Sequence, residues 1–325
     1  MIEGHGDDLY LYRGKVRHNF SSNILQDVDH TALAAWLGSQ PGLLTSYPDP
    51  APEVVERKLE SIHGLPRGTV MVTAGATDAI YMIARRYGGM NSYIFRPTFS
   101  EYGDACRMYG HVFTALEEAD LVWLCNPNNP DGCYRERLPE VKPGAVTVVD
   151  AAYSDYSVRP TLSQAECVSR GDVLMLSSLT KRFSVPGLRV GYVVGHPGLM
   201  APLKELRMPW SVCGMSIAAS MRLLDRMDEY PIDAAGLHDE AMRMAAALRG
   251  MGFAVSDTVC NFFLATLPAG SSSELKNWLV ERYGLLIRDA SNMTGNPADI
   301  RIAAQTRHEN DLLINAISQW ISSRQ

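Results

Sequence analysis

The chain has 325 residues, 46% hydrophobic and 20% charged, so it can bury a sizeable core without disulfides or structural metals. Lysine and arginine number 30 against 36 aspartates and glutamates, which gives a formal net charge of −6. This composition excludes disordered, collagen-like, coiled-coil and membrane-bundle classes. A mildly acidic chain without a basic run also carries no electrostatic footprint for nucleic acid.

The N-terminus and the cysteines predict a cytoplasmic protein. The first 15 residues are polar and partly acidic, whereas a signal peptide needs a basic start and an apolar stretch. No apolar run approaches the roughly 18 residues of a membrane span. The six cysteines are scattered without a Cys-x-x-Cys pair, so we expect reduced thiols and no metal site.

Up to about residue 215, short apolar runs alternate with helical patterns. The predicted strands are residues 70–73, 92–95, 121–125, 146–149, 173–176 and 190–194. Residues 78–87 and 100–109 have helical spacing and end at glycines. Continuous apolar runs indicate strands buried on both faces, and intervening helices indicate βαβ units. The sequence therefore predicts an α/β fold with a largely parallel sheet.

The pattern changes after about residue 215. Predicted helices at 216–227, 235–248 and 273–283 alternate with short strands at 253–255, 262–267, 285–288 and 300–303. Thr306 and Glu309 form a capping-box pattern that begins a last helix, which runs to about residue 321. We therefore predict an N-terminal arm (1–27), a large domain (28–215) and a small α+β domain (216–325).

The most informative stretch runs from Ser178 to Arg189. A predicted strand ends in hydroxyl residues, Lys181 follows, and Arg189 comes eight residues later. Hydroxyls and a guanidinium around one point suit a phosphate, because each supplies hydrogen-bond donors. A lysine held beside a cofactor can form a Schiff base. Taken alone, however, a lysine is far more often a solvated surface residue.

This stretch resembles the signature of the fold type I pyridoxal-phosphate enzymes. It is most similar to the branch that contains histidinol-phosphate aminotransferases and threonine-phosphate decarboxylases. The resemblance implies a mostly parallel seven-stranded sheet sandwiched by helices, a smaller C-terminal α+β domain and pyridoxal 5'-phosphate as cofactor. It also implies that Lys181 carries the cofactor and that Ser178, Thr180 and Arg189 help to bind it.

Further motifs of this family follow in order along the chain. Gly75-Ala76-Thr77 lies at a strand-to-helix turn where the family binds the cofactor phosphate, and a helix N-terminus does favour an anion. The resemblance places Phe99 against the pyridine ring, and Asn129 and Tyr153 on its phenolate oxygen. It pairs Asp150 with the ring nitrogen. Taken one by one, these residues would be assigned to the core, to a turn or to a helix cap.

The resemblance also implies the residues that bind the substrate and the oligomeric state. Arg301 would bind the α-carboxylate and Arg288 a distal phosphate, whereas without the pattern both would be exposed strand residues. Asn23 would supply a polar contact, and His5, in Gly-His-Gly near the N-terminus, would lie near the substrate phosphate. Tyr47 would reach the cofactor phosphate of a neighbouring subunit, which implies a homodimer. Against an acidic background, the site must gather its positive charge locally.

The reaction depends on which bond at Cα stands perpendicular to the cofactor ring. Cleavage of the carboxylate bond gives decarboxylation, and cleavage of the Cα–H bond gives transamination, with Lys181 as the acid–base group. The Gly-His-Gly start at His5 resembles that of threonine-phosphate decarboxylases, and residues 20–23 resemble the family segment that covers the substrate. The resemblance therefore implies decarboxylation of L-threonine O-3-phosphate to aminopropanol phosphate, for cobalamin synthesis. The alternative is a histidinol-phosphate aminotransferase.

Two other protein classes share part of this pattern. Ser178-x-x-Lys181 has the spacing of penicillin-binding proteins, but the Lys-Thr-Gly that they need downstream is absent. Some transcription regulators use a similar cofactor-binding fold as a sensor, but they carry a separate DNA-binding domain. We expect no such domain before Gly75, because that segment is short and has no basic helix.

Overall fold

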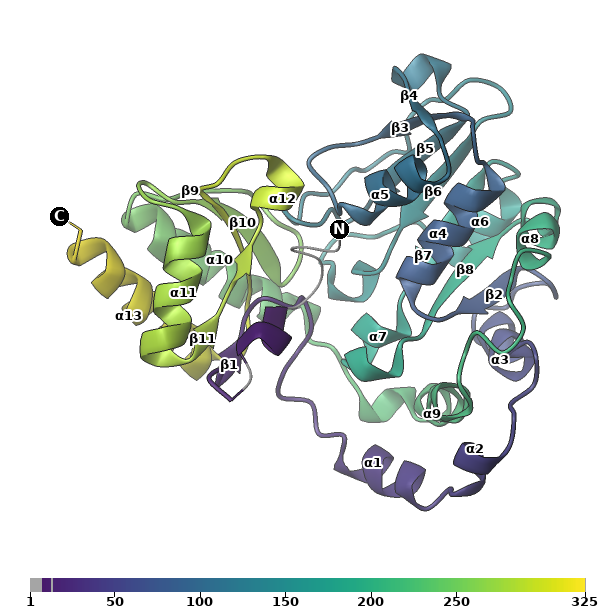
Figure 1. Ribbon diagram of the computed structural model, residues 1–325, viewed down its shortest axis with the longest axis horizontal. Coiled ribbons are helices and arrows are strands. Elements are labelled where there is room, and N and C mark those ends of the chain that lie inside the picture. The colour runs from purple at the N-terminus through teal and green to yellow at the C-terminus, as the bar shows by residue number, and fades with distance from the viewer. Residues whose placement is uncertain (1–7, 13, 325) are drawn as a thin grey trace.

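The computed structural model describes residues 8–12 and 14–324, in which the largest sheet has seven strands (Figure 1). Its spatial order is β2 (Val70–Thr73), β8 (Gly191–Gly195), β7 (Val173–Ser177), β6 (Val146–Asp150), β5 (Leu121–Cys125), β3 (Asn91–Ile94) and β4 (Val112–Phe113). Strand β8 is antiparallel to β2 and β7, and the other neighbours are parallel. The predicted mostly parallel seven-stranded sheet is confirmed.

The predicted strands match closely where the apolar run is long and buried. Strands β2 and β5 have the predicted ends, and every residue in them is buried. Strand β8 begins at Gly191, one residue later than predicted. The backbone carbonyl of Val190 accepts a hydrogen bond from the Thr180 backbone N–H instead of from a sheet partner. The edge strand β4 was not predicted, since it has only two residues and both are exposed.

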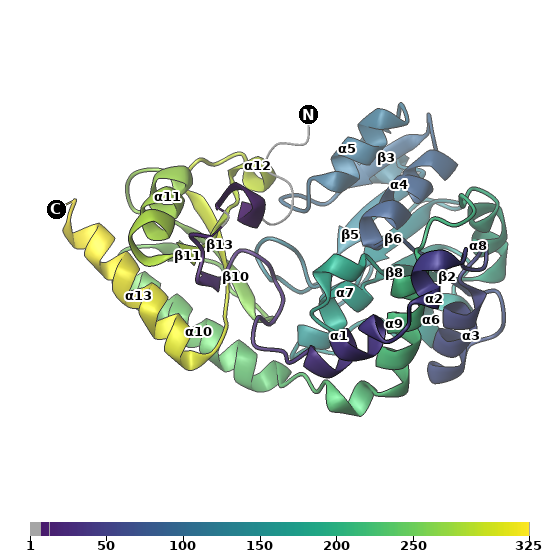
Figure 2. The same cartoon turned by 60° about the horizontal axis from the view of Figure 1, so that its bottom comes forward.

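Helices cover both faces of this sheet (Figures 1 and 2). One face packs against α4 (Ala76–Arg86), α5 (Glu101–Met108) and α8 (Pro197–Lys204). The other packs against α1 (Thr31–Gly38), α3 (Glu53–Ile62), α6 (Gln164–Ser169) and α9 (Gly214–Asp225). Successive residues of β2 alternate between the two cores, with Val70 and Val72 in one and Met71 in the other. Both faces are therefore apolar, as continuous hydrophobic runs predict.

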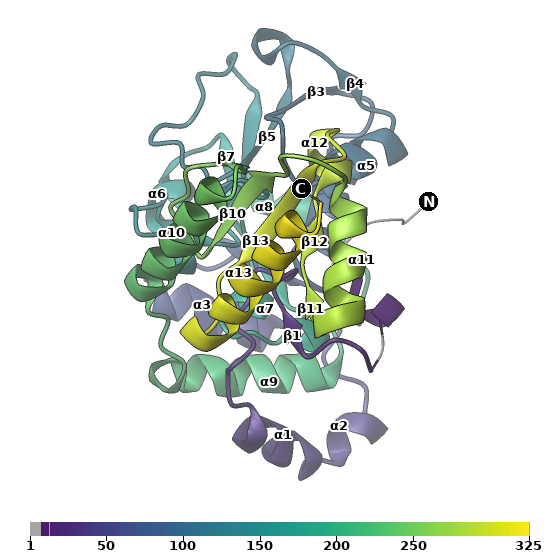
Figure 3. The ribbon, with the colours of Figure 1, turned by 90° about the vertical axis from the view of Figure 1, so that its left-hand side faces the viewer.

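The C-terminal part is a smaller α+β unit. Its antiparallel sheet has the order β12 (Arg288–Asp289), β13 (Asp299–Ala303), β10 (Phe262–Thr266) and β9 (Ala254–Val255). The helices α10 (Ala234–Gly250), α11 (Ser272–Tyr283) and α13 (Arg307–Ser322) lie together on one side of this sheet (Figure 3). The predicted capping box at the start of α13 is present, since the Thr306 and Glu309 side chains each accept from the other's backbone N–H.

Helix α9 packs with the large sheet although it follows residue 213. Its side chains Ala219, Leu223 and Leu224 belong to the same core as Val70 and Val72. The next long helix, α10, is the first one after residue 213 that packs into the core of the C-terminal part. The boundary that we placed at residue 216 thus falls within a helix that packs against the large sheet. An amphipathic pattern shows that a helix has a buried face, but not which sheet covers it.

The N-terminal arm packs on the C-terminal part. Its short helix η1 (Asp8–Tyr12) lies beside α11, where the Tyr12 hydroxyl donates to Asn277 Oδ1 at 2.6 Å. Strand β1 (His18–Asn19) then pairs in parallel with β11 (Leu285–Leu286), and Phe20 is fully buried in the small core. The arm thereby runs from the small core towards the large sheet (Figure 1).

Several short elements complete the fold. They are α2 (Gly42–Thr45), η2 (Leu116–Glu118), η3 (Ser154–Tyr156), α7 (Leu179–Arg182), η4 (Pro186–Leu188), η5 (Met227–Glu229) and α12 (Ser291–Thr294). All six cysteine thiols are free. Among the helices of residues 8–12 and 14–324, none combines the length and the apolarity that crossing a membrane requires.

Candidate active site

A cavity of about 280 Å³ lies where the carboxyl ends of β2, β5, β6 and β7 meet the C-terminal part. Twelve of the predicted site residues line it: Ala76, Thr77, Phe99, Asn129, Asp150, Tyr153, Ser178, Thr180, Lys181, Arg189, Arg288 and Arg301. The arm adds Ser21, Ser22 and Ile24. Motifs far apart in sequence converge here because the carboxyl ends of parallel strands share one edge of the sheet, where ligands bind in such folds.

One end of the cavity is built to hold an anion. Gly75 precedes α4 with φ +86°, and a Cβ on it would lie 2.7 Å from Nη2 of Arg189. Arg189 is itself in the left-handed region, with φ 51°, a conformation that costs energy in a residue with a side chain. Its guanidinium therefore packs against the N-terminus of α4. Two positive features at one point favour an anion such as phosphate.

Two hydroxyl residues that precede Lys181 fix its position. Ser178 caps α7, and its Oγ accepts from the Lys181 backbone N–H at 3.3 Å. The Thr180 hydroxyl donates to the Val190 carbonyl at 3.2 Å, which ties α7 to the start of β8. The Lys181 ammonium lies 5.9 Å from the centre of the Tyr153 ring. The lysine thus projects from a short, firmly anchored helix into the cavity.

Asp150 is the last residue of β6 and is buried. Its Oδ1 accepts from the Ala152 backbone N–H at 2.9 Å, and its Oδ2 accepts from the Tyr102 hydroxyl at 2.7 Å. Burial raises the pKa of Asp150, while both hydrogen bonds and the positive charge of Lys181 oppose the rise. A buried carboxylate held by two donors suits a cationic partner in the cavity.

Arg301, Asn129 and Tyr153 form the wall between the two parts of the molecule. Arg301 Nη1 donates to Asn129 Oδ1 at 2.6 Å, and Nη2 donates to the carbonyl of Ser21 in the arm. The Tyr153 ring packs edge-on against the Phe262 ring, and the two ring centroids are 4.8 Å apart. Burial raises the pKa of Tyr153, so the hydroxyl keeps its proton at neutral pH and can donate a hydrogen bond.

Arg288 lies opposite Arg301 on the neighbouring strand β12, in direct register. It is buried with two charged residues that we did not predict. Asp8 Oδ2 lies 2.8 Å from Lys276 Nζ, and Asp8 Oδ1 lies 3.6 Å from Arg288 Nη1. The sequence held no signal for this cluster, because an acidic residue near a chain end is usually solvated. Asp8 thus joins the arm to an arginine of the cavity.

Replacing Asp8 with asparagine is expected to lower the free energy of unfolding by about 3 kcal/mol, because Lys276 and Arg288 stay buried without their anion. The matched control is Glu281→Gln. It breaks the exposed 2.7 Å pair between Lys15 and the same helix α11, and should cost less than about 1 kcal/mol. Urea unfolding measures both variants. Equal losses would contradict the assignment of a buried, energetically important Asp8.

Asn23 and Tyr47 were also predicted, but neither lines the cavity. Asn23 is 1% exposed, and neither of its amide atoms has a hydrogen-bond partner in the part of the chain that the structure describes. It sits between Ser22 and Ile24, which line the cavity. Tyr47 is 88% exposed and outside the cavity, and its predicted role concerns a second subunit. His5 lies outside the described residues.

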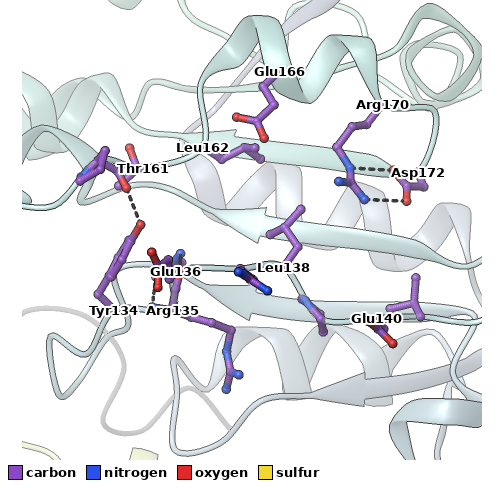
Figure 4. Close-up of a pocket in the computed structure, with 15 residues that line it drawn as sticks. Tyr134, Arg135, Glu136, Leu138, Glu140, Thr161, Leu162, Glu166, Arg170 and Asp172 are labelled. Atoms are coloured by element: carbon purple, nitrogen blue, oxygen red, sulfur yellow. Dashed lines mark hydrogen bonds and ion pairs between the residues drawn. The ribbon is translucent and has the colours of Figure 1, made fainter.

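A larger, open pocket of about 750 Å³ lies on the loops after β5 and before β7 (Figure 4). Two of its charged groups, Arg170 and Asp172, pair with each other through two 3.0 Å contacts. The Tyr134 hydroxyl donates to the Pro160 carbonyl at 2.6 Å. None of the candidate residues that the structure describes lines this pocket. The smaller cavity is therefore the candidate active site.

A family model for aminotransferase class I and II matches residues 18–317, nearly the whole chain. The chain belongs to this family. Class I and II aminotransferases use pyridoxal 5'-phosphate, so the predicted family and cofactor are confirmed. The anion-binding pocket at α4, the buried Asp150 carboxylate and the anchored Lys181 fit this cofactor.

Relatives within the family have more than one activity. A protein assigned as a threonine-phosphate decarboxylase from Caldanaerobacter subterraneus subsp. tengcongensis is 29% identical, over 84% of this chain and 83% of its own. A histidinol-phosphate aminotransferase from Symbiobacterium thermophilum is 26% identical, over 84% of this chain and 81% of its own. Family membership therefore leaves the reaction open between decarboxylation and amino-group transfer.

Solved structures give the same picture. The crystal structure of L-threonine-O-3-phosphate decarboxylase from Porphyromonas gingivalis is 30% identical with a TM-score of 0.89, and the match covers 94% of this chain and 100% of that one. A histidinol-phosphate aminotransferase from Sinorhizobium meliloti in complex with pyridoxal 5'-phosphate is 18% identical with a TM-score of 0.83, over 98% and 94%. The second likeness shows the shared fold alone.

Proposed function

We propose that this enzyme decarboxylates L-threonine O-3-phosphate to (R)-1-aminopropan-2-yl phosphate, as a step of cobalamin biosynthesis. The observation that carries the proposal is the direct register of Arg288 and Arg301, both buried and both lining the cavity. Two cations on adjacent strands suit a short substrate with two anionic ends. Threonine phosphate has a carboxylate and a phosphate on neighbouring carbons, whereas histidinol phosphate has a single anionic group.

The size of the cavity supports the same substrate. A space of about 280 Å³ is at the small end for a ligand site, and it must hold the cofactor as well. Threonine phosphate lacks the imidazole ring that histidinol phosphate would have to place there. The relative of known structure with 30% identity, a threonine-phosphate decarboxylase, points in the same direction.

Each residue of the cavity has a separate proposed role. When bound, pyridoxal 5'-phosphate supplies an electron-withdrawing ring that stabilises negative charge at Cα of the substrate. Asp150 would keep the ring nitrogen protonated, and Asn129 and Tyr153 would bind the phenolate oxygen. Arg301 would hold the substrate carboxylate and Arg288 its phosphate. Lys181 Nζ would deliver a proton to Cα after carbon dioxide leaves.

The test is an assay with threonine phosphate in the absence of 2-oxoglutarate. Carbon dioxide and aminopropanol phosphate are expected in equal amounts, with no requirement for an amino-group acceptor. If no carbon dioxide formed and the amino group of histidinol phosphate were transferred to 2-oxoglutarate, the protein would be an aminotransferase and the proposed decarboxylation would be wrong.

We also propose that the protein is a homodimer. The rings of Tyr47 and Trp210 contact each other, with their centroids 5.6 Å apart. Both side chains are exposed, as are those of Leu44 and Met208, which lie near them in the chain. A cluster of large exposed apolar side chains is typical of a protein interface. Such an interface would bring Tyr47 to the site of a second subunit, as the family resemblance implies.

Replacing Trp210 with glutamate is expected to convert the dimer into a monomer, because a charge at the centre of the apolar cluster must be desolvated on association. Light scattering coupled to size-exclusion chromatography measures the mass. The control is Met108→Glu, which places the same charge on an exposed methionine at the end of α5. A wild-type protein that elutes as a monomer would refute the dimer.

A further inference from the structure

A tyrosine behind the cofactor site donates a hydrogen bond to the side chain of Asp150. Tyr102 lies on α5 and is 1% exposed, and its hydroxyl donates to Asp150 Oδ2 at 2.7 Å. The two residues are 48 positions apart in the chain. Tyr102 also lines the cavity, although we did not predict it as a site residue.

Aromatic neighbours hold the Tyr102 ring in this orientation. It stacks on Trp123, with the ring centroids 5.2 Å apart and an interplanar angle of 16°. It also makes an edge contact with Phe99, with the ring centroids 5.8 Å apart and an interplanar angle of 84°. The packing of the ring on both sides fixes the position of its hydroxyl oxygen beside Asp150. The phenol is therefore a preorganised donor to the carboxylate rather than a surface group that happens to reach it.

The contact matters because Asp150 is buried, where an ionised carboxylate is costly. Ala152 supplies a backbone donor, Lys181 faces the carboxylate from α7, and Cys125 lies beside it on β5. Burial raises the pKa of Asp150, and among the opposing influences the Tyr102 hydrogen bond is the largest. Without that bond, the carboxyl group would move towards its neutral form.

We propose that Tyr102 is a positioning residue of the cofactor site, which orients the Asp150 carboxylate and keeps it ionised so that it can pair with a protonated pyridine nitrogen. The proposal concerns only the cofactor, so it holds for a decarboxylase and for an aminotransferase. It assigns to α5 a role beyond packing against the sheet.

The test is Tyr102→Phe, which removes one oxygen atom and keeps the stacked ring. Apoenzyme is titrated with pyridoxal 5'-phosphate and with its analogue in which carbon replaces the ring nitrogen. We expect about tenfold weaker binding of the natural cofactor, as for loss of a hydrogen bond to a charged group, and unchanged binding of the analogue. Equal weakening for both compounds, or none for either, would overturn the proposal.

Two controls separate this role from a general effect on folding. Tyr81→Phe removes the same atom from a tyrosine of α4 whose hydroxyl donates to Glu101 of α5 at 2.9 Å, and should change neither affinity. In an Asp150→Asn background, Tyr102→Phe should cause no further loss of cofactor affinity, since the two groups act as one unit. Additive losses in the double variant would refute the coupling.

Discussion

Replacing Lys181 with alanine is expected to abolish turnover, with a loss of at least about 10⁴-fold, and to remove the visible absorption band of the bound cofactor. The lysine would both hold the cofactor covalently and move the proton at Cα, so no other group can take over. Its ammonium projects into the cavity from a helix whose cap and hydroxyl contacts fix its direction. Absorption spectroscopy and a turnover assay measure the two effects.

Arg182 provides the control for this experiment. It follows Lys181 on α7, but its Nη1 donates to the Tyr230 carbonyl at 2.7 Å and it does not line the cavity. Arg182→Ala should retain the absorption band. If Lys181→Ala still showed the band and turned over substrate, the assignment of the cofactor lysine would be wrong.

The second large effect is expected for Arg301→Lys. A lysine keeps the charge but loses the planar fork that binds a carboxylate through two hydrogen bonds. Loss of a buried charged contact costs about 2 to 4 kcal/mol, so kcat/KM for threonine phosphate should fall roughly 30- to 1,000-fold. Because Arg301 also donates to Asn129 and to the Ser21 carbonyl, alanine would disturb the wall of the cavity. Steady-state kinetics measure the change.

Inhibition by the product distinguishes the two arginines. Aminopropanol phosphate has a phosphate but no carboxylate, so its inhibition constant should be unchanged in Arg301→Lys and weakened in Arg288→Lys. The direct register of the two residues makes them a matched pair on adjacent strands. The reverse pattern would exchange their roles, and equal weakening in both variants would contradict separate anion sites.

The charges around the cavity are more balanced than the sequence suggested. We expected the site to gather positive charge from Lys181, Arg189, Arg288 and Arg301 against an acidic chain. The structure shows that Asp8 contacts Arg288 and that Asp150 faces Lys181. The phosphate site proposed at Arg288 would therefore include a carboxylate of the arm.

Local features of the fold could be predicted from the sequence alone. Strands β2 and β5 are continuous apolar runs between turn residues, and the capping box of α13 is set by two side chains three positions apart. The order of the family motifs likewise identified twelve of the residues that line the cavity. In each case the information lies within a short window, in hydrophobic spacing, caps and turn chemistry.

The rest was decided by tertiary packing. Asp8 reaches Lys276 across 268 positions, and Tyr102 reaches Asp150 across 48. Helix α9 joins the core of the large sheet although it lies beyond the predicted boundary. A periodic pattern gives a residue a buried face but no partner, because the partner depends on which elements the chain brings together. The sequence by itself therefore determined the elements and the cofactor motifs, and only the tertiary structure decided which side chains contact Arg288 and Asp150.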